Sequence, residues 1–195
     1  MKKVDNFHFE LIPFRDGQGA GRRGTVGDFG EVTVLRPTAS RNRRDGPTAS
    51  RTLVMGDGVP EAVFRGRGAG MPGFQGATLH VKGSSVAMER NPLGVRPKSR
   101  ALQLDYQGRK FSYTHFGVSK GSELKSESGK VTLAPGRHIR RTGTVTAGVA
   151  SGDLDALSLV LAVIFEEVNT SSLTLSGAAS MVPIRLITYN STEPS

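Results

Sequence analysis

One apolar segment, Leu154–Val168 (LDALSLVLAVIFEEV), constrains the fold of this chain more than any other feature. Between Ala156 and Phe165 only Ser158 is polar, so a helix formed here has no hydrated face and must be enclosed by protein or by lipid. About 12 apolar residues make a rod of about 18 Å, which is shorter than the ~20 residues that span a bilayer. The segment therefore predicts a buried core helix and no transmembrane segment.

Polar residues mark both ends of this predicted helix. Ser151–Asp153 offer N-caps, and Asp153 and Asp155 place negative charge at the positive end of the helix dipole. Glu166 and Glu167 are expected to return the chain to water and to anchor the helix end near a barrel mouth or the surface.

Short strand-like runs fill the rest of the chain. Val4–Phe14 alternates, with Phe7, Phe9 and Leu11 on one face, and later runs are separated by turn residues. The other predicted strands are Glu31–Arg36, Thr52–Met55, Ala62–Arg65, Ala77–Lys82, Ser85–Arg90, Arg100–Tyr106, Lys110–His115, Glu123–Ser126, Lys130–Leu133, Thr142–Thr146, Ser172–Leu175 and Val182–Tyr189.

About a dozen strands are too many for most open sheets, which curl or close at that size. A closed sheet also supplies the enclosure that the apolar helix requires. We therefore predict an all-β protein: a closed antiparallel barrel of about 12 strands around a central hydrophobic C-terminal helix, Leu154–Val168. Residues 1–195 are expected to form a single barrel domain, with a frayed tail at 190–195.

A Gly/Arg-rich stretch at 15–51 is predicted to be a flexible insertion. Asp16–Gly30 holds six glycines, and Gly19–Gly24 matches the dinucleotide pattern GxGxxG literally. That pattern has meaning only where its last glycine opens a helix, and here a strand-like run follows. Pro37–Arg51 repeats the sequence PTASR around a polar spacer, without apolar periodicity.

Charge and cysteine usage restrict the environment and the partners. The chain has no cysteine, which indicates an intracellular, cytoplasmic protein, and the N-terminus lacks the apolar core of a secretory signal. The net charge is +9, and residues 142–195 hold one Lys or Arg against five Asp or Glu. The basic body suits an anionic partner, or it is a solvated, arginine-rich surface.

No pattern in the sequence supports catalysis or a cofactor. His8, His80, His115 and His138 lack the paired spacing of metal ligands. A nucleophile elbow and a phosphate-binding P-loop are also missing. We expect a non-enzymatic protein without cofactor or metal, although active-site residues dispersed along the chain would escape this reading.

Two basic loops are the candidate anion sites. The first carries Arg90, Arg96, Lys98 and Arg100, with prolines that exclude helix, and the second carries Arg137, Arg140 and Arg141. Cationic loops bind phosphate groups, and they also protect strand edges from aggregation. The leading hypothesis is a binding or scaffold protein that engages anionic phospholipid headgroups or a protein partner, peripherally at a membrane.

The alternative is a nucleic-acid-binding protein that uses the arginines of the insertion. They are Arg22, Arg23, Arg41, Arg43 and Arg44. Few aromatic residues lie among them, which disfavours base stacking. Nucleic acid is therefore the less favoured partner.

The segment Gly152–Val168 (GDLDALSLVLAVIFEEV), arriving after many short strands, resembles the tubby C-terminal-like superfamily. Its relatives include LURP-one-related proteins and phospholipid scramblases. The resemblance implies a roughly twelve-stranded barrel around a hydrophobic helix near the C-terminus. It also implies binding of phosphoinositides or other membrane lipids through basic residues on the barrel. No short ligand motif of the family matches this chain residue by residue.

Overall fold

The computed structural model describes residues 6–37, 49–68, 70–90 and 100–174. In this part of the chain, twelve strands form one closed antiparallel barrel, in which each strand pairs with its neighbours in sequence and β1 pairs with β12. The strands are β1 (Phe7–Arg15), β2 (Gly19–Thr25), β3 (Glu31–Pro37), β4 (Ala49–Met55), β5 (Ala62–Arg67), β6 (Thr78–Val81), β7 (Ser84–Glu89), β8 (Leu102–Tyr106), β9 (Arg109–Gly117), β10 (Gly121–Lys125), β11 (Gly129–Ile139) and β12 (Gly143–Gly152).

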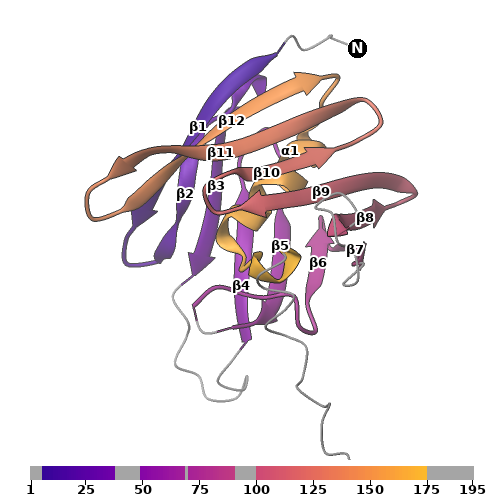
Figure 1. Ribbon diagram of the computed structural model, residues 1–195, viewed down its shortest axis with the longest axis horizontal. Helices are drawn as coiled ribbons and strands as arrows, with labels where there is room; N and C mark the ends of the chain where they lie inside the picture. Colours follow the sequence, from indigo (N-terminus) through magenta and orange to yellow (C-terminus); the bar gives the residue numbers. More distant parts are fainter. Residues whose placement is uncertain (1–5, 38–48, 69, 91–99, 175–195) are drawn as a thin grey trace, which may run out of the picture.

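The apolar segment lies inside this barrel, as Figure 1 shows. It forms α1 (Ala156–Val163) and continues as a 3₁₀ helix, η3 (Ile164–Glu167). Asp155 caps the helix by accepting a 2.9 Å hydrogen bond from the Ser158 amide. The predicted barrel around a central helix is confirmed, with an α-helical part shorter than Leu154–Val168 because the last turn tightens to 3₁₀ geometry.

The core is formed between the helix and the inward side of the strands. Every residue of α1 from Leu157 to Val163 is buried, and a fully buried Leu or Val contributes about 1.5–3 kcal/mol to stability. The Phe165 ring centroid lies 4.4 Å from that of Tyr113 and 5.9 Å from that of Phe64. These rings hold the end of the helix against opposite walls of the barrel.

One strand contradicts the prediction of a flexible loop. Gly19–Thr25 forms β2, which pairs with β1 and β3. A Cβ on Gly21 would lie 2.0 Å from the Val34 carbonyl oxygen, and one on Gly24 would lie 1.9 Å from that of Glu10. Glycine is therefore required here because neighbouring backbones approach closely, and not because the segment is mobile.

Four further predictions meet different outcomes. Ser172–Leu175 was predicted as a strand, but Ser171–Leu173 forms a 3₁₀ helix, η4. The predicted strand Val182–Tyr189, the tail at 190–195 and residues 38–48 of the predicted loop Pro37–Arg51 lie outside the described residues. The two ends of that loop were predicted wrongly, because Pro37 belongs to β3 and residues 49–51 belong to β4. A short 3₁₀ turn, η1 (Gly27–Phe29), connects β2 to β3. Among the described helices, none has the length and apolar character needed to cross a bilayer.

Candidate functional site

The hairpin between β11 and β12 carries a group of exposed cations. Arg137, Arg140 and Arg141 are all exposed, and residues 135–144 contain no acidic residue. The Ile139 carbonyl accepts a 3.3 Å hydrogen bond from the Thr142 amide, which closes the turn. Among the described residues, the one ion pair of this group joins Arg137 to Glu10 at 4.0 Å, with both side chains more than half exposed. The hairpin therefore presents three cations to solvent.

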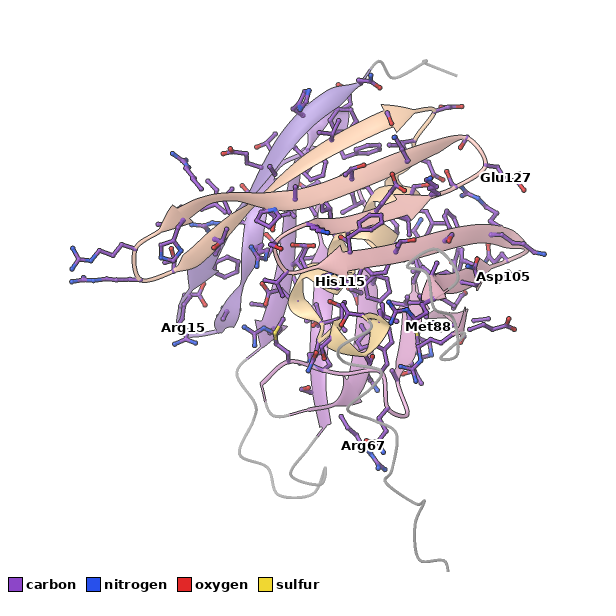
Figure 2. The ribbon with its side chains drawn as sticks, viewed as in Figure 1. Arg15, Arg67, Met88, Asp105, His115 and Glu127 are labelled. Carbon is purple, nitrogen blue, oxygen red and sulfur yellow. The ribbon has the colours of Figure 1, made fainter. Side chains whose placement is uncertain are left out.

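The β1–β2 hairpin adds two cations near the base of this turn. Pro13 of β1 lies beside Gly143, the first residue of β12, at about the van der Waals distance from where a Cβ would sit. Arg15 and Arg23 are exposed, and the Arg23 guanidinium lies 5.4 Å from the centroid of the Phe14 ring. Figure 2 shows Arg15 on the same side of the view as the β11–β12 hairpin. We call Arg15, Arg23, Arg137, Arg140 and Arg141 the basic hairpin surface.

The other predicted basic loop is not a continuous exposed surface. Arg90 is exposed, donates a 3.2 Å hydrogen bond to the Ser172 hydroxyl and lies 5.8 Å from the centroid of the Phe74 ring. Arg96 and Lys98 lie outside the described residues. Arg100, which lies just before β8, is only 5% exposed, so it does not act as a surface cation.

The arginines of the nucleic-acid alternative are also separated by the structure. Arg41, Arg43 and Arg44 lie outside the described residues, whereas Arg23 is exposed. Arg22 pairs with Pro13 of β1 in an inward-facing position, and its NH1 group donates a 2.5 Å hydrogen bond to the Thr144 carbonyl. The expectation that Arg22 meets a nucleic acid is corrected, because its guanidinium is engaged inside the barrel.

Both glutamates at the end of the helix face the barrel lumen, and neither returns the chain to water. Glu167 is 5% exposed, and its carboxylate oxygens lie 3.1 Å from Arg22 Nε and 2.6 Å from Arg36 Nε. The Thr52 hydroxyl donates a 2.7 Å hydrogen bond to the Glu167 carbonyl. The predicted solvent exposure of Glu167 was wrong, because arginines on β2 and β3 supply the partners that a buried carboxylate needs.

Glu166 lies beside this pair and is held differently. It accepts a 2.7 Å hydrogen bond from the Thr146 hydroxyl, and Arg22 Nε is 3.9 Å away. Burial raises the pKa of the Glu166 carboxyl above its ordinary value, against the lowering by Thr146 and Arg22. Burial also raises the pKa of the Tyr113 hydroxyl, and the Glu166 charge raises it further. The end of the helix therefore stands in a polar, weakly hydrated lumen.

We name this region the polar lumen end. It consists of the inward-facing polar side chains of the barrel around the C-terminal end of the helix. They are Arg22, Arg36, Ser50, Thr52, Arg100, Tyr113, His115, Ser122 and Thr146, together with Glu166 and Glu167. Sequence reasoning missed this region because Arg22 and Arg36 acquire an inward direction only once β2 and β3 are paired in register.

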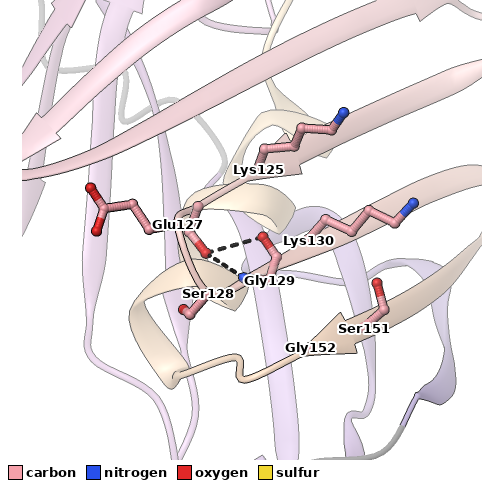
Figure 3. A pocket seen from close by; sticks show the side chains of 8 residues that line it. Lys125, Glu127, Ser128, Gly129, Lys130, Ser151 and Gly152 are labelled. Carbon is pink, nitrogen blue, oxygen red and sulfur yellow. Dashed lines mark hydrogen bonds between the residues drawn. The ribbon is translucent and has the colours of Figure 1, made fainter.

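An open depression lies at the turn that joins β10 to β11, shown in Figure 3. It measures about 370 Å³ and is lined by residues 125–130 with Ser151 and Gly152. Ser126 accepts a 3.1 Å hydrogen bond from the Gly129 amide. Lys125 lies 3.1 Å from Glu123. This lysine is already paired, so the depression offers less free charge than the basic hairpin surface.

The described residues contain no group of three or more His, Asp or Glu side chains placed to hold a metal ion. His8 and His138 are exposed and stand apart on β1 and β11. His115 lies on β9, and burial lowers the pKa of its imidazole.

Comparison of the chain with known protein families, with curated proteins and with solved structures finds no match. The resemblance to the tubby C-terminal-like superfamily therefore stays a prediction. The evidence for the barrel and its internal helix comes from the structure alone.

Proposed function

We propose that this barrel is a non-enzymatic, intracellular binding protein that engages anionic phospholipid headgroups through the basic hairpin surface. The observation that carries the proposal is the turn at Arg137–Thr142, which holds three exposed arginines without a close carboxylate partner. A protein of this kind acts peripherally, at the cytoplasmic face of a membrane, where anionic lipids create a negative surface potential.

Two features of the hairpin support this choice over a solvated surface. The turn extends beyond the paired strands, as Figure 1 shows, so all three arginines can meet one flat surface together. Exposed cations next to acidic residues would be neutralised locally, whereas this hairpin has only the long 4.0 Å pair to Glu10. A Lys or Arg near an anionic bilayer contributes about 1 kcal/mol, so three give a measurable affinity.

The test is co-sedimentation of the full chain with vesicles of phosphatidylcholine alone and of phosphatidylcholine with phosphatidylserine. We expect binding to the anionic vesicles that weakens as salt rises. The triple variant Arg137→Gln, Arg140→Gln and Arg141→Gln should bind about a hundredfold more weakly, since it loses three contributions of about 1 kcal/mol. Equal binding by the variant would overturn the assignment to this surface.

A matched control keeps net charge from explaining the result. Arg65→Gln, Arg67→Gln and Lys110→Gln removes three exposed cations from β5 and β9, on other parts of the barrel. This variant should retain most of the binding.

Nucleic acid is the second anion to test, by gel shift on DNA and RNA at low and high salt. Steeply salt-dependent binding to any sequence, with no retention on anionic vesicles, would replace the lipid with nucleic acid as the partner.

A further inference from the structure

The buried side-chain nitrogen and oxygen atoms that lack a hydrogen-bond partner gather in one place. Within the described part of the chain they belong to five residues, all at the polar lumen end: Arg22, Ser50, Arg100, His115 and Ser122. Arg22 Nε is accounted for by Glu167, 3.1 Å away. None of the other four residues has an ion pair with a described residue, and Arg100 is the one among them that carries a permanent positive charge.

Of these residues, Arg100 is the one whose burial costs the most free energy. It is 5% exposed, and neither its Nε nor its NH1 has a partner among the described residues. No carboxylate of the described residues lies within 4 Å of it either, in contrast to Arg22 and Arg36. Burying an ionised group without a partner is strongly unfavourable, and an arginine stays charged in proteins. The guanidinium therefore lacks an anionic partner that would complete it.

Two other donors lie at the end of the neighbouring strands that is nearest to Arg100. The pairing of β8 with β9 ends at Leu102 and Tyr113; Arg100 lies two residues before Leu102 and His115 two residues after Tyr113, at the same end of this antiparallel pair. His115 in turn pairs with Ser122 of β10. His115 Nδ1 is buried without a partner. The Ser122 hydroxyl makes only a weak contact, with the Tyr113 hydroxyl, whose pKa it lowers.

The chemistry of these groups selects an acceptor. A guanidinium has donors only, and its planar fork suits the oxygens of a carboxylate or a phosphate. Burial lowers the pKa of His115, so the imidazole is neutral at pH 7 and can donate from one nitrogen. A serine hydroxyl can donate as well. An oxyanion would satisfy all three residues at once, whereas a cation would be repelled by the Arg100 guanidinium and an apolar group would leave all three without a partner.

We propose that Arg100, His115 and Ser122 form an internal binding site for a small oxyanion, either a phosphate or a carboxylate group. This site is separate from the basic hairpin surface, and it does not depend on the proposed lipid binding.

The test is thermal unfolding of the full chain with sodium phosphate, sodium acetate or sodium chloride at constant ionic strength. A ligand of the folded state raises the unfolding midpoint with saturation. A hundredfold excess of phosphate or acetate over its Kd should raise the midpoint by about 5–10 °C. The arm that saturates identifies the source of the oxyanion.

Arg100→Met is the decisive variant, because it keeps much of the side-chain volume and removes the charge. Without ligand it should unfold at the same temperature as the wild type or a higher one, since an unpaired buried charge is lost. With phosphate or acetate its saturable shift should disappear. Phosphate also stabilises proteins by exclusion from their surface, and that unsaturable part should stay in both proteins.

The hairpin variant Arg137→Gln, Arg140→Gln and Arg141→Gln is the matched control and should keep the saturable shift. A second measurement covers the case in which Arg100→Met fails to fold. In the wild type, the His115 imidazole resonances should move on titration with the same anion, and those of His8 and His138 should not. An equal saturable shift in wild type and Arg100→Met, or no saturable shift and no movement of His115 with either anion, would overturn the site.

Discussion

Glu167 Oε2 accepts a 2.6 Å hydrogen bond from Arg36 Nε, and so joins the last turn of the internal helix to strand β3. The same carboxylate lies 3.1 Å from Arg22 of β2. Thus one acidic side chain at the end of the helix connects two adjacent strands of the barrel. The Arg36 NH1 group also donates a 3.1 Å hydrogen bond to the Gly70 carbonyl, which connects the loop after β5 to this end.

Glu167→Gln should destabilise the protein, because Arg22 and Arg36 lose the charge that offsets their own burial. Breaking a buried pair costs about 3–5 kcal/mol, and the two arginine side chains are 20% and 23% exposed, so we expect about 3 kcal/mol. Urea unfolding measures the change. Glu123→Gln, whose lysine partners are half exposed, is the control and should cost less than about 1 kcal/mol. Equal losses would mean that the Glu167 pair adds no more than a surface pair.

Glu166 should make the free energy of unfolding of the wild type fall as the pH rises. Burial raises its folded-state pKa above the unfolded value, so the folded state binds the proton more tightly. The contribution to stability is greatest below the unfolded pKa and is lost as the pH rises through the folded pKa. Glu166→Gln removes this loss while the amide oxygen still accepts from Thr146. The stability of the variant relative to wild type should therefore rise between pH 4 and pH 7 in urea titrations. A difference in stability between variant and wild type that stays constant across this pH range would contradict the prediction.

Gly148→Ala tests the packing at the seam where the barrel closes. A Cβ at this position would lie 2.1 Å from Cζ of the Phe9 ring, which faces it from β1. Overpacking of a core costs about 1–3 kcal/mol, measurable as a lower urea midpoint. Phe9→Leu should be less harmful in the Gly148→Ala background than in wild type, because the smaller side chain frees the space. Strict additivity of the two changes would show that the ring does not limit this position.

Leu161→Asp should abolish soluble expression, because Leu161 is fully buried in the middle of α1 and nothing there can pair with a carboxylate. Val118→Asp introduces the same group at a position that is 90% exposed and should express normally. The comparison is the soluble fraction after expression under the same conditions. A soluble, folded Leu161→Asp protein would show that the helix is not enclosed.

The barrel could be predicted from the sequence because its strongest signal is insensitive to register. An apolar run without a polar face needs an enclosure whatever surrounds it, and the turn residues supply approximate strand boundaries. Strand β2 was not predicted, because Gly21 and Gly24 were interpreted as signs of a flexible loop. These positions require glycine because any added Cβ would lie less than 2.5 Å from a neighbouring backbone atom, and that contact exists only in the folded barrel.

The inward cations could not be predicted for a related reason. A one-residue change of register moves a side chain from the surface to the lumen. Arg22 was expected outside because β2 was not recognised, and Arg100 because it was grouped with the cations of the proline-rich loop although it also began the predicted strand Arg100–Tyr106. The exposed arginines at 137–141 were easier, since a turn rich in cations faces solvent under any register.

The order of the elements along the chain also determines when this fold can be completed. Helix α1 follows β12 in sequence, yet the lumen that it fills is bounded by β1, the first strand. During synthesis all twelve strands therefore leave the ribosome before the helix, and their apolar inward faces are uncovered until it is made. A chain that ends before residue 154 lacks the helix that fills the lumen, so we expect it to expose apolar surface and to aggregate or bind chaperones.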